Sequence, residues 1–83
     1  MNKLIEDELE NLQAGDWVKV VVCDQGEFSG RIEQILVDDN MISGFVLAKN
    51  SYVRYDHLRY AKQLDTTSTF LASDIVEMNG YGR

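Results

Sequence analysis

Residues 15–32, GDWVKVVVCDQGEFSGRI, decide the fold class of this chain. Residues 17–23 alternate their side chains between two faces, and both faces are largely apolar, which is typical of a β-strand covered on both sides. The following Asp24-Gln25-Gly26 is a turn signal, and a second strand begins at Glu27. The stretch therefore predicts two successive antiparallel strands.

The second strand changes its pattern part-way along. Its apolar positions move from Ile32 to Ile35 and Val37, so the face that carries them changes near residues 33–34. A β-bulge or a bend at that point would account for the change. Gly30, in the middle of the strand, indicates a sharply curved strand or a close approach of another segment.

Further short strands are expected downstream, separated by turns. Their β-branched and aromatic composition and the Asn, Asp and Gly residues between them predict strands over residues 41–49, 52–55, 66–70 and 75–78. Asp56 is placed to cap a helical turn over residues 56–61. Residues 79–83 read as a loose tail.

The N-terminal segment, residues 1–14, predicts an amphipathic helix, which is clearest over residues 2–13. Its apolar side chains fall near one stripe: Leu4, Ile5, Leu9 and Leu12. Gly15 stands where a glycine would end such a helix. A helix of about twelve residues is marginal in isolation. We therefore expect its stripe to pack on the face of the first strand that carries Trp17.

Two stretches resemble the ends of SH3-like small barrels, including KOW-type ones. Residues 12–20, LQAGDWVKV, resemble the opening, where a Gly-Asp pair enters the first strand. Residues 70–77, FLASDIVE, resemble the close, where a short 3₁₀ turn leads into the last strand. The resemblance implies a mainly β, SH3-like barrel of about five short antiparallel strands over residues 15–78, with the N-terminal helix packed on it. The alternative is an α+β fold with an antiparallel sheet and two helices.

The resemblance does not carry a function with it. Peptide-binding SH3 domains use a paired-aromatic loop and a proline, and this chain has no proline. KOW-type domains usually present a basic face to nucleic acid, whereas this chain has 14 acidic and 8 basic residues and a net charge of −6. That balance disfavours nucleic acid as a partner.

Composition excludes several other classes. One cysteine cannot form an internal disulfide framework. No apolar stretch is long enough to span a membrane, and no signal-peptide pattern is present, so we expect a cytoplasmic protein without a membrane partner. Hydrophobic residues make up 45% of the chain, which is ordinary for a folded domain.

The positive charge is concentrated in one stretch. Residues 44–62 carry four basic residues and one acid, while the rest of the chain is acidic. The same stretch holds three of the four tyrosines and the single histidine. Tyrosine and arginine are favoured at interfaces. We therefore take these as partner-binding candidates: Tyr52, Arg54, Tyr55, Arg59 and Tyr60. The alternative is that single members fill the core or pair with local acids.

Trp17 and Phe45 are possible apolar anchors for a partner. A single Trp at the start of a strand more often packs beneath a neighbouring helix, here against Leu9 and Leu12, and we favour that placement for Trp17.

No catalytic constellation is evident. Cys23 and His57 are the only conventional nucleophile and base, and Cys23 ends a core-like strand, which favours an inert buried thiol. Asp38 and Asp39 lack the spacing of a calcium loop. We expect no enzyme, no metal site and no cofactor.

The sequence thus favours a non-catalytic module that binds a protein partner or itself. A nucleic-acid-binding barrel using residues 52–62 is the alternative. A third hypothesis is an acidic accessory protein that occupies a basic site through Glu6, Asp7, Glu10 and Asp16.

Overall fold

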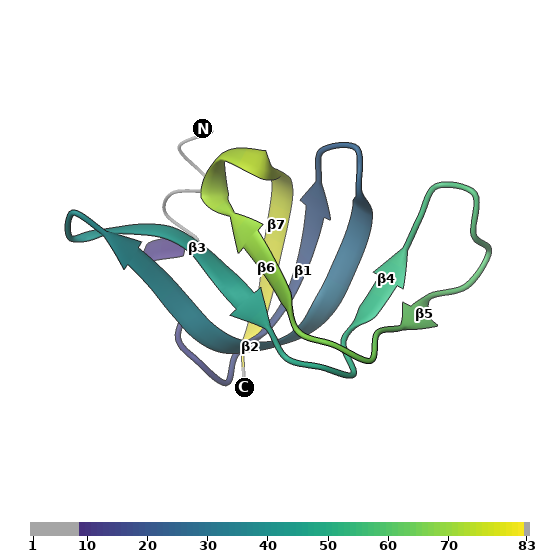
Figure 1. Ribbon diagram of the computed structural model, residues 1–83, viewed down its shortest axis with the longest axis horizontal. Coiled ribbons are helices and arrows are strands. Elements are labelled where there is room, and N and C mark those ends of the chain that lie inside the picture. Colours follow the sequence, from purple (N-terminus) through teal and green to yellow (C-terminus); the bar gives the residue numbers. More distant parts are fainter. Residues whose placement is uncertain (1–8, 83) are drawn as a thin grey trace.

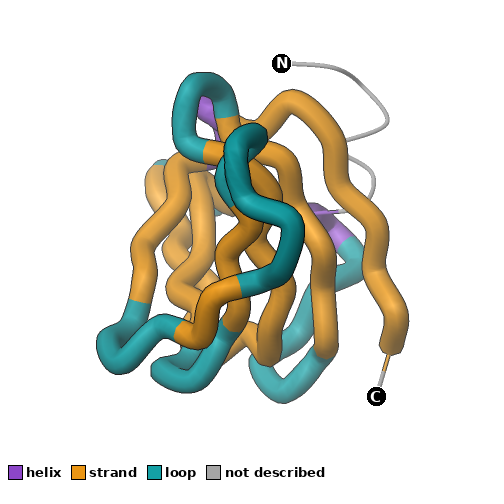
Figure 2. Tube along the Cα trace, turned by 90° about the vertical axis from the view of Figure 1, so that its right-hand side faces the viewer, coloured by secondary structure: helices purple, strands orange, loops and turns teal. Residues whose placement is uncertain are grey.

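The longest strand organises the fold, which is mainly β. The computed structural model describes residues 9–82, and its elements in chain order are β1 (Trp17–Val22), β2 (Gly26–Asp38), β3 (Met41–Leu47), β4 (Tyr52–Arg54), β5 (Lys62–Gln63), β6 (Ser68–Leu71), the 3₁₀ turn η1 (Ala72–Asp74) and β7 (Ile75–Gly82). The first part of β2 lies between β1 and β4, and its second part pairs with β3 (Figure 1). Beyond these, β7 pairs with β1, β6 with β3 and β5 with β4, all antiparallel. The described chain therefore forms two antiparallel layers that share β2 and curve around one core (Figure 2).

The irregularity predicted in β2 is confirmed. Ile32 pairs with Leu47 and Gln34 pairs with Val46, so Glu33 is the extra residue of a bulge. The bulge lets β2 leave one sheet and enter the other. Gly30, just before it, is also confirmed as a close approach, because a Cβ there would overlap the side chain of Ser51.

The turns match the sequence as well. Asp24 and Gly26 have φ angles of 60° and 106° in the turn between β1 and β2. Asp39 and Asn40 connect β2 to β3 with φ angles of 50° and 64°. Left-handed angles at both central residues are those of the two-residue turn that best matches the twist of a hairpin.

The core lies between the two layers. Val18, Val20 and Val22 supply one face of β1 to it, and tilted aromatic rings fill its centre. The ring centroids of Phe28 and Phe70 are 4.7 Å apart, and those of Phe45 and Phe70 are 5.7 Å apart. Phe45 is 0% exposed, so the expectation that it serves as an apolar anchor at the surface is wrong.

The N-terminal helix is not confirmed. Residues 1–8 lie outside the described residues, Leu9 and Glu10 are helical, and the chain then turns instead of continuing as a helix to residue 13. The reason is that the following segment bonds to itself and to β2. The Asp16 carboxylate accepts the Gln13 N–H at 3.0 Å, and Gly15 N–H donates to Ile32 O at 2.8 Å.

The expected cover of the Trp17 face is also wrong. Leu9 and Leu12 are buried in the core cluster that contains Val18 and Val20, which is the other face of β1. Lys19 and Val21, the companions of Trp17, remain partly exposed. Among residues 9–82, β1 is therefore fully buried on one face, and its other face is partly exposed.

Two expectations in the second half need correction. Residues 56–61 do not form a helical turn, because Leu58 N–H donates to Tyr55 O at 2.9 Å in a tight turn and the chain then returns as β5. The tail expected from residue 79 is strand up to Gly82, since β7 continues along β1 with Val18 opposite Gly80. Strand pairing with β1 outweighs the low strand preference of these glycines and asparagine. No helix among residues 9–82 is long and apolar enough to cross a membrane.

Candidate functional site

The tyrosines and arginines singled out in the sequence lie at one end of the molecule. We call them the aromatic–basic end: Tyr52, Arg54, Tyr55, Arg59 and Tyr60. They belong to β4 and to the loop between β4 and β5, at the right of Figure 1. All five side chains are exposed, and Tyr60 is the most exposed of the three tyrosines, at 68%. None of them fills the core.

Strand alternation positions the first two of these side chains. Val53 is fully buried, so Tyr52 and Arg54 on either side of it point outward together. Pairing with β2 places Tyr52 opposite Ser29 and Arg54 opposite Glu27. Arg54 makes no ion pair with any described residue, and Glu27, opposite it, pairs with Lys19 of β1 at 3.4 Å.

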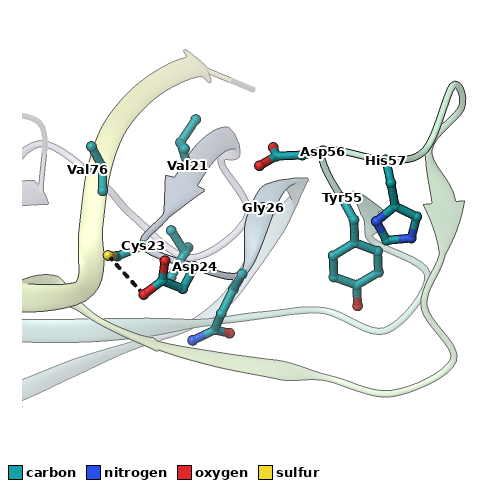
Figure 3. A pocket seen from close by; sticks show the side chains of 10 residues that line it. Val21, Cys23, Asp24, Gly26, Tyr55, Asp56, His57 and Val76 are labelled. Atoms are coloured by element: carbon teal, nitrogen blue, oxygen red, sulfur yellow. Dashed lines mark hydrogen bonds between the residues drawn. The ribbon is translucent and has the colours of Figure 1, made fainter.

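A stacked pair of rings follows β4. The rings of Tyr55 and His57 are 5.8 Å apart between centroids and nearly parallel, at 7°. Both side chains stand on one wall of an open concavity of about 600 Å³ (Figure 3). The opposite wall comes from β1 and its turn and from Val76, the residue of β7 that bulges out between the partners of Val21 and Val22. The concavity thus has one wall with two aromatic rings and a second wall that combines three valines with the polar turn at residues 23–25.

Cys23 lies in the turn on that second wall and is exposed, which corrects the expectation of a buried thiol. Its Sγ donates a hydrogen bond to Asp24 Oδ2 at 3.7 Å (Figure 3). The negative charge of Asp24, followed by desolvation, raises the pKa of the thiol above its ordinary value, and Asp74 adds to this. The raised pKa keeps the Cys23 thiol protonated at neutral pH, and His57 lies on the opposite side of the concavity, beside Tyr55 (Figure 3).

A second, smaller groove surrounds Trp17. Trp17 is 43% exposed, so the expectation that it packs beneath a helix is wrong, while its candidacy as an anchor remains a prediction. It lies directly opposite Arg31 in the pairing of β1 with β2. The two line a groove of about 240 Å³ with Lys49 and its neighbours in the loop before β4.

Sequence reasoning did not connect Arg31 and Lys49 with Trp17. A signal for Arg31 was present, because counting back from the tight turn at residues 23–25 pairs Val22 with Gly26 and hence Trp17 with Arg31. Lys49 arrives through the tertiary path of the loop after β3, which no local pattern specifies.

The acids of the third hypothesis do not form a shared surface in the described chain. Asp16 is buried, and its carboxylate accepts the Gln13 N–H. Glu10 is exposed, and Glu6 and Asp7 lie outside the described residues. Between residues 9 and 82, no three His, Cys, Asp or Glu side chains gather closely enough to hold a metal ion.

Comparisons with protein-family models, with curated proteins and with solved structures gave no match to this chain. The assignment of a function therefore rests on the geometry of the two surfaces described above.

Proposed function

We propose that this chain is a non-catalytic interaction module on an SH3-like small barrel and that it binds a protein partner. Three features support the barrel. A Gly-Asp pair leads into β1, the glycine-bearing second strand is long and bent, and a 3₁₀ turn joins the last two strands. The hairpin of β4 and β5 is then an insertion between β3 and β6, and it carries the binding surface.

The observation that carries the proposed function is the aromatic–basic end itself. Three exposed tyrosines and two arginines stand together on the inserted hairpin. Arg54 and Arg59 make no ion pair with any described residue, so a partner's carboxylates can take them without breaking an internal contact. Tyrosine and arginine supply most of the energy in many protein interfaces.

The test compares two variants with the same change of net charge. Arg54→Ser/Arg59→Ser alters the aromatic–basic end, and Arg31→Ser/Lys49→Ser alters the groove beside Trp17. The immobilised chain is incubated with a soluble extract of the cells in which it naturally occurs, and the affinity for the captured protein is measured. We expect the first variant to bind at least about tenfold more weakly and the second to bind as the unmodified chain does. Equal losses in both variants would contradict this location of the surface.

Single-stranded nucleic acid is a second candidate, and the groove beside Trp17 favours it. An exposed indole opposite an arginine, with a lysine nearby, combines a stacking platform with two phosphate ligands. The net charge of −6 opposes it at long range. Fluorescence of Trp17 during titration with a short single-stranded oligonucleotide tests this candidate. Binding predicts quenching that weakens steeply with salt, and unchanged fluorescence at low salt eliminates it.

A further inference from the structure

The end of the molecule opposite the aromatic–basic end carries complementary chemistry. Residues 37–41 form the tip of the hairpin of β2 and β3, at the far left of Figure 1, and we call them the acidic tip. Val37 and Met41 are 63% and 69% exposed, and Asp38 and Asp39 are exposed beside them. Two large apolar side chains thus stand in water next to two carboxylates.

Charge is segregated along the long axis of the molecule. Residues 33–47 contain three acids and no Lys or Arg, while residues 49–62 contain four basic residues and one acid. The tip of the first segment and the β4–β5 hairpin of the second lie at the two ends of a body that measures 37 × 23 × 20 Å (Figure 1). Asp38 and Asp39 make no ion pair with any described residue, as is true of Arg54 and Arg59. The unpaired charges of opposite sign therefore face away from each other within one copy.

We infer that the acidic tip of one copy docks on the aromatic–basic end of a second copy. This inference rests on the proposed function, because it names the partner of that surface. The Asp38 and Asp39 carboxylates would meet the guanidinium groups of Arg54 and Arg59. Val37 and Met41 would pack on the tyrosine rings, which methionine sulfur contacts favourably.

The direction of the contact follows from the charges. Tip against tip would bring carboxylates together, and basic end against basic end would bring guanidinium groups together, whereas tip against end pairs opposite charges. The contact is therefore head-to-tail, and each copy retains one free tip and one free end after the first contact. Repeated contacts of this kind build an open filament or close into a ring.

The acidic tip is well suited to insertion because its backbone is already ordered. Asp38 pairs with Met41, and Asp39 and Asn40 occupy the left-handed angles of a tight hairpin turn. An ordered tip loses little conformational freedom on binding, so its contacts convert more fully into affinity.

Sedimentation velocity on the full chain and on two variants tests the inference. The tip variant is Asp38→Asn/Asp39→Asn, and the end variant is Arg54→Gln/Arg59→Gln. The control variant, Glu10→Gln/Glu77→Gln, changes the net charge as the tip variant does but at exposed positions outside both ends. We expect the full chain and the control to form species larger than a dimer as concentration rises, and to lose them at high salt.

Mixing the tip variant with the end variant gives the sharpest outcome. Each of these two variants alone should self-associate at least tenfold more weakly than the full chain. A 1:1 mixture should form a heterodimer and nothing larger, because only one intact tip and one intact end remain.

Three outcomes would overturn the inference: a monomeric full chain up to about 1 mM, a tip variant that associates as the full chain does, or association that requires added oligonucleotide. A monomeric chain whose capture of another protein still depends on Arg54 and Arg59 would overturn self-docking alone. Capture of another protein that does not depend on Arg54 and Arg59 would overturn the proposed function as well.

Discussion

Gly30 of β2 and Ser51 of the loop before β4 lie so close together that a side chain at position 30 has no space. A Cβ on Gly30 would overlap the Ser51 hydroxyl oxygen and lie 2.5 Å from the Ser51 Cβ. The same hydroxyl donates a hydrogen bond to Ala48 O at 2.5 Å, which holds the loop in place. This contact joins the hairpin that carries the aromatic–basic end to the strand that both layers share.

Gly30→Ala should therefore destabilise the fold by about 1–3 kcal/mol through overpacking. Ser51→Gly removes the atoms that the new methyl group would meet, so Gly30→Ala/Ser51→Gly should lose less than the sum of the two single losses. Urea unfolding measures all three variants, with Ser29→Ala as a control on the same strand. If the double variant lost as much stability as the two single variants together, the contact with Ser51 would not be what excludes a side chain at position 30.

Truncation of Phe45 should cost much more stability than truncation of Trp17. Phe45 is fully buried against Phe70, so Phe45→Ala should cost about 3–5 kcal/mol and leave the domain marginal. Trp17 is half exposed, and Trp17→Ala should cost about 1 kcal/mol or less. Thermal unfolding distinguishes them, and comparable losses would contradict the exposure of the indole.

The last residues should contribute to stability because they pair with β1. Deleting residues 79–83 removes the partners of Val18 and Lys19 and should cost about 1–3 kcal/mol. Amide hydrogen exchange should then accelerate along β1. Asn79→Ala keeps the backbone pairing and should change the exchange rates little. If Asn79→Ala accelerated exchange along β1 as much as the deletion does, a role for the strand backbone would be contradicted.

Cys23 should react slowly with iodoacetamide at neutral pH. Deprotonation would place a thiolate beside the Asp24 carboxylate, which raises the pKa of the thiol, and alkylation should therefore accelerate only as pH rises into the alkaline range. Asp24→Asn removes the main cause, so it should lower the pKa and speed alkylation at pH 8. Asp74→Asn should have a smaller effect in the same direction, and a reversed order would contradict this assignment.

Patterns confined to one hairpin could be predicted from the sequence. The turn at residues 24–26, the bulge near Glu33 and the close approach at Gly30 follow from alternation and glycine placement, and the structure confirms all three. The exposure of the candidate tyrosines and arginines is also as expected, although the partner they bind stays a proposal.

Relations between distant segments could not be predicted in this way. Leu9 and Leu12 face the core instead of Trp17, because the Asp16 carboxylate and the backbone bonds to Ile32 turn the chain before a helix reaches that far. The turn at residues 56–58 replaces a helical turn, since the chain must return along β4.

The sequence by itself determined the first three strands, their turns and the uneven distribution of charge, because alternation, turn preference and charge are properties of neighbouring residues. Only the tertiary structure decided which face of β1 is covered, that Phe45 is core while Trp17 is exposed, and that residues 79–82 belong to a strand. It also decided that the acidic tip and the aromatic–basic end point in opposite directions. The physical reason is that burial and direction depend on pairings between segments far apart in the chain, and the energy of those pairings outweighs local preference.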